Sequence, residues 1–333
     1  MEHARQFSSV SAFDLAYAAC RGAGAGETTA RSLAEATVSA ELHGKPAVGF
    51  RHLVDYLAAF ATGRIVGGAE PELSSPAAAI IRSDAHGGIA QLGFDRAFED
   101  LRQRSAAYGV AIFAQDNSYT SGELGYYVRR LAENGLVALA ATNGPALMTT
   151  PGGIAPVYCT NPLAFAAPVE NGPPLVIDQA SSATAFVTIR QRAESGEQLP
   201  PGWAVDENGV ETTDAHAAMR GALLTFGGSR GANVALMVEI LAAGLTGANW
   251  SLDAPSFIDG ADAPGAGLFV VAIAPKLLAP DFARRLGSQL ARLAGMGVHI
   301  PGRRDRSQEI ELPSALVEAV EAYRTKAPSS AAG

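Results

Sequence analysis

The chain has 333 residues, of which 48% are hydrophobic and 17% charged, and its formal net charge is −8. This composition supports a large core and argues against a disordered chain, and the length is enough for two or three domains. The acidic balance and the scattered Lys and Arg residues argue against a nucleic-acid partner, because a phosphate backbone is bound by a continuous basic surface.

The two cysteines and the apolar segments indicate the compartment. Cys20 and Cys159 are too few for a disulfide framework and have no zinc-ligand spacing. The first residues lack the apolar segment of a signal peptide, and no apolar run approaches the roughly 18 residues of a membrane span. We therefore expect a cytoplasmic protein with free thiols and no membrane partner.

The first sixty residues have the pattern of helices. Ser11 is a suitable N-cap for a helix that begins at the next residue, because its hydroxyl can accept from a free backbone N–H. After a glycine-rich break at 22–26, Thr28 or Thr29 restarts a helix with apolar residues at helical spacing. A proline turn then separates it from a third helix over 49–61.

Strands and helices alternate in the middle of the chain. A β-hairpin is expected over 76–94, with its turn at the polar and glycine-rich segment 83–88. Short apolar runs with β-branched residues favour buried strands over helices. The elements expected after the hairpin are a helix over 95–108, a strand over 110–114, a helix over 122–134, and strands over 136–142, 163–167 and 175–177.

The last third begins with a polar segment, 192–218, which is rich in Gly and Pro and is expected to be a surface excursion. The glycine turn 227–231 opens a helix through Leu241, and a strand follows over 268–274. Helices over 280–294 and 313–325 end the chain, and we expect the helices of both ends to pack together. The fold class is therefore α/β.

The glycine turn is a candidate phosphate site. Backbone N–H groups at a helix start attract a phosphate oxygen, and Arg230 can hold phosphate through its planar guanidinium. The spacing Gly-x-Gly-x-x-Gly is absent and no acidic residue follows on a second strand, so this is not a Rossmann fingerprint. An ordinary glycine-rich helix entry stays the alternative.

Two titratable groups have positions that suit chemistry. Asp178 ends a strand, where a carboxylate often faces a cleft or else caps the next turn. His52 and Tyr56 lie one helical turn apart and share a face with Val48. His52 can bind a carboxylate, donate a proton or pack as an ordinary histidine. The other histidines lack metal-ligand spacing, so no metal site is expected.

Two polar segments carry a family resemblance. The first is Asn117-Ser118-Tyr119-Thr120-Ser121-Gly122-Glu123-Leu124-Gly125-Tyr126-Tyr127, and the second is Thr160-Asn161-Pro162. Together they resemble the NAD(P)-dependent malate, L-lactate, sulfolactate, ureidoglycolate and cyclic-imine oxidoreductases, which do not use a Rossmann fold. Further segments match in the same order, so that the resemblance covers about residues 10–310: Gly63-Arg64-Ile65, Thr142-Asn143, Pro151-Gly152-Gly153, Pro201-Gly202-Trp203, Leu245-Thr246-Gly247 and Ile300-Pro301-Gly302.

The resemblance implies a non-Rossmann α/β subunit. Its parts would be a helical domain over 1–70 and 280–333, a mixed α/β core segment over 71–140, and an NAD(P)-binding α/β domain over 141–279. It also implies NADH or NADPH as cofactor and a homodimer with the active site near the subunit interface. By position, the cofactor-binding residues would be Thr160, Asn161, Asp178, Ser181, Gly228, Arg230 and Arg304.

Three positions at which this chain differs from the family limit the reactions that it is expected to catalyse. Relatives typically carry histidine at the positions of Val48 and Thr120, and many carry arginine at that of His52. Oxidation of an alcohol needs a base for the hydroxyl proton, which Val48 cannot supply. A cyclic imine that arrives protonated needs no strong acid from the enzyme. The preferred function is therefore NAD(P)H-dependent reduction of a small carboxylate at C2, Δ1-pyrroline- or Δ1-piperideine-2-carboxylate.

The residues expected to serve this reaction lie on both polar segments and on the third helix. Thr120, Ser121 and Glu123 would orient an iminium and its carboxylate. The catalytic set is His52, Thr120, Ser121, Glu123 and Asp178, and the substrate-binding set is Val48, His52 and Tyr56. One alternative is a 2-hydroxyacid dehydrogenase of the malate or L-lactate type with His52 as a relocated acid/base. Another is a dinucleotide-binding protein without catalysis.

Overall fold

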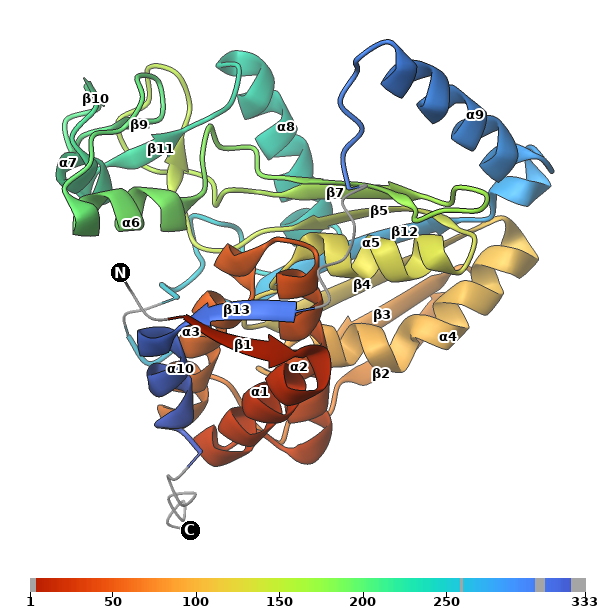
Figure 1. Ribbon diagram of the computed structural model, residues 1–333, viewed down its shortest axis with the longest axis horizontal. Coiled ribbons are helices and arrows are strands. Elements are labelled where there is room, and N and C mark those ends of the chain that lie inside the picture. The colour runs from red at the N-terminus through yellow and green to blue at the C-terminus, as the bar shows by residue number, and fades with distance from the viewer. Residues whose placement is uncertain (1–3, 258–259, 303–308, 325–333) are drawn as a thin grey trace.

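Figure 1 shows the computed structural model, which describes residues 4–257, 260–302 and 309–324. A seven-stranded sheet forms its centre. In spatial order the strands are β2 (Glu72–Ala77), β3 (Ile80–Asp84), β4 (Val110–Ser118), β12 (Ala266–Ile273), β5 (Val137–Thr142), β7 (Leu163–Ala167) and β8 (Leu175–Gln179). Strands β3 and β4 run parallel, and the other adjacent pairs are antiparallel. The parallel pair is joined by helix α4 (Ala90–Tyr108), because such a pair needs a crossover connection.

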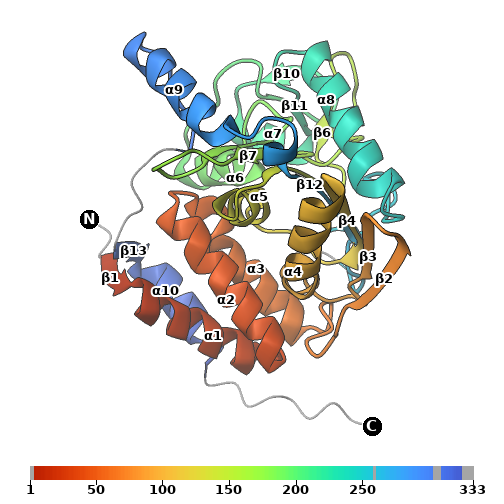
Figure 2. The same ribbon diagram turned by 90° about the vertical axis from the view of Figure 1, so that its right-hand side faces the viewer.

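Helices cover both faces of this sheet (Figures 1 and 2). Helix α4 and helix α5 (Leu124–Glu133) pack on one face, where Phe94, Phe113 and Tyr127 belong to one buried core. Helix α8 (Ser229–Glu239) and the π-helical segment Ile240–Gly244 pack on the other face. Successive strand residues point to opposite faces, so the near-continuous apolar strands serve both cores.

The helices of the N-terminal segment form a separate layer with the C-terminal end of the chain. The layer contains α1 (Ser9–Ala23), α2 (Glu27–Leu42), the 3-10 turn η1 (Pro46–Val48), α3 (Phe50–Ala61), α10 (Ser314–Glu321) and the antiparallel strands β1 (Ala4–Ser8) and β13 (Glu309–Pro313). One apolar core joins these helices. The expected cap of the first helix is wrong by one turn: the Ser8 hydroxyl accepts from the Ser11 N–H at 3.1 Å, because β1 continues to Ser8.

The other C-terminal helix does not join this layer. Helix α9 (Phe282–Gly295) forms close to its expected position in sequence, but it lies beside the β7–β8 loop, where the Glu170 N–H donates to the Ala283 carbonyl at 3.3 Å. Figures 1 and 2 show it extending away from the N-terminal helices. The expectation that helices of both ends pack together therefore holds for α10 and not for α9.

The polar segment expected as a surface excursion is more ordered than its composition indicates. It contributes to a four-stranded sheet in the order β10-β9-β11-β6. The parts of this unit are β6 (Met148–Thr149), α6 (Phe186–Ser195), β9 (Ala204–Val205), β10 (Glu211–Thr212), α7 (Ala215–Arg220) and β11 (Ala222–Leu224). A small apolar core that includes Met148, Ile189 and Leu223 holds it together.

The expected hairpin turn is also wrong. Strands β2 and β3 form the hairpin around Ala78 and Ala79, and the polar segment 83–88 instead leads into α4, which starts at Ala90. Strand β4 is longer than expected, since it continues to Ser118. Among the helices of the described residues, none is long and apolar enough to cross a membrane.

Candidate active site

The first polar segment, 117–127, is rich in hydroxyl groups, and its residues 119–123 form the loop between β4 and α5. This loop contacts one face of α3. His52 Nε2 lies 3.1 Å from the Thr120 hydroxyl oxygen. The Tyr56 hydroxyl donates to the Thr120 carbonyl at 3.0 Å and accepts from the Thr120 hydroxyl. The rings of His52 and Tyr56 meet edge-on with centroids 4.9 Å apart, as expected for residues four apart on a helix. The structure therefore brings three of the predicted residues into contact.

The second ring nitrogen of His52 also has a partner. His52 Nδ1 lies 3.0 Å from an oxygen of Asp55, one turn further along α3. The side chains of His52 and Asp55 are 21% and 34% exposed, so this contact reaches solvent on one side. The sequence analysis missed Asp55, although its spacing of three residues from His52 on a helix was a usable signal.

Buried amide and phenol groups support the loop from behind. Gln91, on α4, donates to the Tyr56 hydroxyl at 3.2 Å and to the Ser121 carbonyl at 3.1 Å. The Tyr127 hydroxyl donates to the same Ser121 carbonyl at 2.6 Å. Burial raises the pKa of Tyr56 and of Tyr127 above the ordinary range, so both phenols keep their protons. Gln91 was not foreseen, because nothing in its local sequence marks it.

Two carboxylates converge on the start of α5. Glu123 is almost fully buried and forms an ion pair with Arg129 of the same helix, and Arg129 also donates to the Ser39 hydroxyl at 3.2 Å. An oxygen of Asp178, at the end of β8, accepts from the Gly125 N–H at 2.9 Å. A side chain at Gly125 would place its Cβ 2.9 Å from Glu123 Oε1 and 3.1 Å from Asp178 Oδ2. Glycine thus allows the two acids to approach one another.

Groups of both charges act on the pKa of Asp178. Burial raises the pKa of Asp178, and the nearby Glu123 raises it further, whereas Lys45 lowers it. The Lys45 ammonium donates to the Asp178 carbonyl at 3.3 Å and so ties the turn before η1 to the end of β8. Val48 ends η1 and is half-buried, with no titratable group to offer. Lys45, like Asp55 and Gln91, is a site candidate that was not predicted from the sequence.

The glycine turn begins α8 as expected. Gly227 and Gly228 have φ of 56° and 64°, a conformation that favours glycine, and α8 starts without a side-chain cap. Arg230 lies in the first turn and is exposed. Uncapped N–H groups beside an exposed guanidinium fit an anionic phosphate group, and thereby fit the phosphates of a nicotinamide dinucleotide.

Two of the other cofactor candidates, Asn161 and Ser181, face inward. The Asn161 amide is fully buried and donates to the Ala235 carbonyl at 2.9 Å and to Glu239 at 2.7 Å. The Ser181 hydroxyl donates to the Asn161 carbonyl at 2.7 Å, and the Ser181 N–H donates to the Thr160 carbonyl at 2.8 Å. The hydrogen bonds of Asn161 thus hold the buried side of α8 in place. Arg304 lies outside the described residues.

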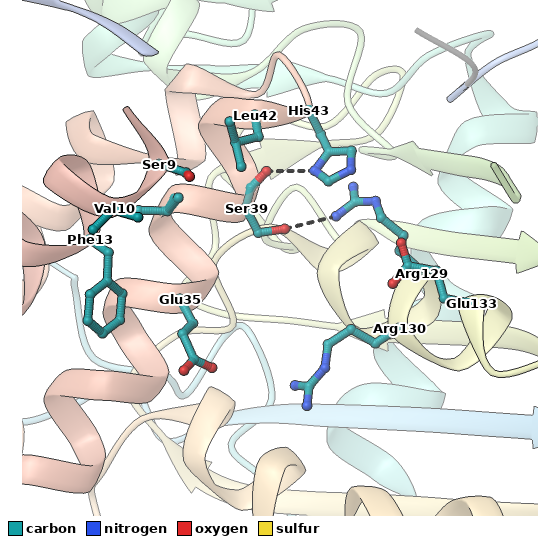
Figure 3. A pocket seen from close by; sticks show the side chains of 11 residues that line it. Ser9, Val10, Phe13, Glu35, Ser39, Leu42, His43, Arg129, Arg130 and Glu133 are labelled. Carbon is teal, nitrogen blue, oxygen red and sulfur yellow. Dashed lines mark hydrogen bonds between the residues drawn. The ribbon is translucent and has the colours of Figure 1, made fainter. Parts of the chain in front are cut away.

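A separate cavity of about 430 Å³ lies between α1, α2 and α5 (Figure 3). Arg129 lines it together with Ser39 and His43, and the His43 ring contacts the Ser39 carbonyl at 2.7 Å. None of the predicted site residues is among the described residues that line it. Within the described chain, no group of three or more His, Cys, Asp and Glu side chains is arranged to hold a metal ion.

Comparison with known proteins gives concordant matches. The family described as malate/L-lactate dehydrogenase matches residues 8–320. The chain is 36% identical over 327 residues to a (2R)-3-sulfolactate dehydrogenase (NADP(+)) of Chromohalobacter salexigens, a match that covers 96% of this chain and 98% of the relative. It is 38% identical over 292 residues to a Δ1-pyrroline-2-carboxylate/Δ1-piperideine-2-carboxylate reductase of Pseudomonas putida, which covers 86% of each.

A solved structure agrees with these relatives. The crystal structure of Δ1-piperideine-2-carboxylate reductase from Pseudomonas syringae superposes with a TM-score of 0.91 at 34% sequence identity. The superposition covers 96% of this chain and 99% of the other. The described fold is therefore shared along nearly the whole length of both proteins.

Proposed function

The chain belongs to the malate/L-lactate dehydrogenase family and is an NAD(P)-dependent oxidoreductase, and on this premise we propose that it reduces a cyclic imine 2-carboxylate. The substrates would be Δ1-pyrroline- or Δ1-piperideine-2-carboxylate, and the products the corresponding cyclic amino acids. The reductases of Pseudomonas putida and Pseudomonas syringae support this choice, because both are named for such substrates.

The observation that carries the proposal is the pair of carboxylates at the start of α5. Two carboxylates, those of Glu123 and Asp178, approach the same backbone position, and Arg129 compensates one of them. A protonated imine placed nearby gains from these negative charges, whereas a neutral carbonyl gains less. Lys45, beside Asp178, is suited to the substrate carboxylate.

For this reaction the protein has to bind the cofactor and orient the substrate. A bound reduced nicotinamide dinucleotide would supply the hydride for C2, with the electron pair of the C=N bond taken up by nitrogen. Arg230 and the N–H groups at the start of α8 would hold the phosphates of the dinucleotide. Thr120 and Ser121 would orient the imine, and half-buried Val48 would contact its hydrocarbon ring.

A second candidate function is reduction of a 2-oxoacid, which the His52–Asp55 contact favours because a carbonyl oxygen must receive a proton. One panel separates the two functions. Oxidation of NADPH and NADH is followed with both cyclic imines and with pyruvate, oxaloacetate and 3-sulfopyruvate. We expect the highest kcat/KM with a cyclic imine. A protein that reduces 2-oxoacids far better than either imine would make the proposal wrong.

We further propose a cytoplasmic homodimer, and apolar residues at both ends of α9 support the assembly. Leu278 and Met296 are 82% and 79% exposed, and a second copy of the chain packed along α9 would cover them. We expect sedimentation to show a dimer and a Leu278→Glu/Met296→Glu variant to dissociate. Val210→Glu, at another exposed apolar position, is the control. A fully active monomer would contradict this proposal.

A further inference from the structure

Both ring nitrogens of His52 are engaged within the chain, and this limits what the residue can do. Nδ1 faces the Asp55 carboxylate at 3.0 Å, and Nε2 faces the Thr120 hydroxyl at 3.1 Å. To bind a substrate carboxylate directly, His52 would have to give up one of these contacts. The arrangement is better suited to moving a proton along the contacts than to gripping an anion.

The hydrogen atoms can be assigned from the partners. A carboxylate only accepts, so Nδ1 carries a hydrogen that it donates to Asp55. Nε2 can then donate to the Thr120 oxygen when the ring is charged, or accept from the Thr120 hydroxyl when the ring is neutral. In the first case the Thr120 hydrogen points to the Tyr56 hydroxyl, as the short contact between them allows. Rotation of one hydroxyl hydrogen therefore satisfies both protonation states of His52.

We infer that Asp55 is a positioning residue that holds His52 as the Nδ1–H tautomer, so that His52 delivers a proton through the Thr120 hydroxyl to the substrate nitrogen. This inference rests on the proposed function and extends it. A protonated imine needs no such delivery, but an imine that has lost its proton does. The relay would therefore keep the enzyme active when the free substrate is neutral.

The step balances in atoms and charge. Hydride adds to C2, the C=N electron pair moves to nitrogen, and the nitrogen takes the Thr120 hydroxyl hydrogen. The Thr120 oxygen takes the Nε2 hydrogen of His52, which becomes neutral while its Nδ1–H stays with Asp55. NAD(P)H becomes NAD(P)⁺, and solvent returns the proton to His52, whose side chain is partly exposed.

Among the neighbouring groups described below, His52 is the best suited to donate a proton. The titratable and charged side chains near the relay include Asp55 and Tyr56 on α3, Tyr119 on the loop, whose ring contacts Tyr56, and Arg64 after α3. Both phenols are buried, and burial raises the pKa of Tyr56 and of Tyr119, so neither gives up a proton readily. Arg64 donates to the Phe257 carbonyl at 2.5 Å and stays charged.

The first test compares pH profiles for cyclic-imine reduction. At low pH, where the imine is protonated, we expect the rates of Asp55→Asn and Thr120→Val to be closer to wild type than at higher pH, with a residual loss in Thr120→Val because Thr120 also orients the imine. Once the pH is high enough for the free imine to lose its proton, but not so high that the wild-type His52 ring is neutral, we expect kcat of these variants to fall by about 10²-fold or more relative to wild type, the share usual for general acid catalysis. Thr120→Ser and Asp55→Glu should restore most of the rate. His86→Gln, which alters an exposed histidine paired with acids elsewhere, is the control.

The second test does not depend on turnover. Nitrogen-15 NMR of labelled histidine, with His52 assigned from His52→Gln, reports the tautomer of the neutral ring. We expect Nδ1–H in the wild type and loss of that preference in Asp55→Asn, as happens when the acid behind a catalytic histidine becomes an amide. Unchanged signals of the remaining histidines would show that the variant is folded.

The two tests separate the relay from the proposed function. Imine reduction with an unchanged pH profile in Asp55→Asn overturns the relay and leaves the function intact. If the wild type reduces no cyclic imine, the function is wrong and the NMR result alone judges the relay. An Nε2–H tautomer in the wild type then overturns it, and an Nδ1–H tautomer that depends on Asp55 supports it.

Discussion

The loop between β4 and α5 and the start of α8 are built in opposite ways. At the loop, polar side chains already have partners within the chain, as in the contacts of Thr120 with His52 and Tyr56. At α8 the helix starts uncapped and Arg230 is exposed. Proton transfer requires groups held in place before the substrate arrives, whereas phosphate binding uses donors that remain available for the ligand.

The other end of α8, in contrast to its uncapped start, is held by buried hydrogen bonds. Glu239, near the end of α8, is buried and accepts from the Ser251 N–H at 2.6 Å, from the Ser251 hydroxyl at 2.8 Å and from Asn161 at 2.7 Å. The buried carboxylate thus has three donors. A rigid base under an exposed helix start orients its N–H groups without occupying them.

The largest expected effect comes from breaking the closed region at Arg129. Arg129→Met would leave the Glu123 carboxylate buried without its partner, and removal of one member of a buried ion pair costs about 3–5 kcal/mol of folding free energy. Chemical denaturation would measure the loss. A double variant, Glu123→Leu with Arg129→Met, should recover most of it. A single variant as stable as wild type would show that this pair is not part of a closed support.

The open region should respond in affinity and not in stability. Arg230→Ala is expected to weaken dinucleotide binding by about 1–3 kcal/mol, the range for a charge-assisted hydrogen bond to phosphate. Its unfolding midpoint should stay near that of wild type, because Arg230 is exposed. Calorimetric titration measures the affinity, with Arg220→Ala, a surface arginine on α7, as control. Unchanged affinity would remove Arg230 from the cofactor site.

The smallest expected effect concerns the acid between the two regions. The pKa of Asp178 is raised in the folded chain, chiefly by burial, so the charged carboxylate destabilises the fold above that pKa. Asp178→Asn keeps an acceptor for the Gly125 N–H and removes the charge. We expect a higher Tm than wild type at neutral pH.

This gain should disappear as the pH falls below the unfolded-state pKa of aspartate, about 3.9, where both folded and unfolded chains bind the proton. Thermal unfolding at a series of pH values measures it. A lower Tm at neutral pH would instead show that the charge of Asp178 stabilises the fold. Reduced imine turnover in the same variant would fit a charge retained for function at the expense of stability.

Local pattern predicted most of the regular elements and failed where turn chemistry misled it. The apolar runs at 163–167 and 175–177 form β7 and β8, because a buried strand needs only such a run. The segment 83–88 has the residues of a turn but leads into α4, whereas the true hairpin turn, Ala78-Ala79, has none of them. Strands β1 and β13 pair Gln6 with Glu311, so that the two ends of the sequence meet. No pattern within either segment predicts this pairing.

The amino-acid sequence by itself determined the α/β class and the family, and it predicted the residues of the candidate site. The hydroxyl-rich segment and the glycine turn could be found there, because each is continuous along the chain. Only the tertiary structure decided what these residues contact. Thr120 against His52, Gln91 behind Tyr56 and Glu123 beside Asp178 come together through packing of separate helices and strands, and such contacts depend on how whole elements fit and not on local residue order.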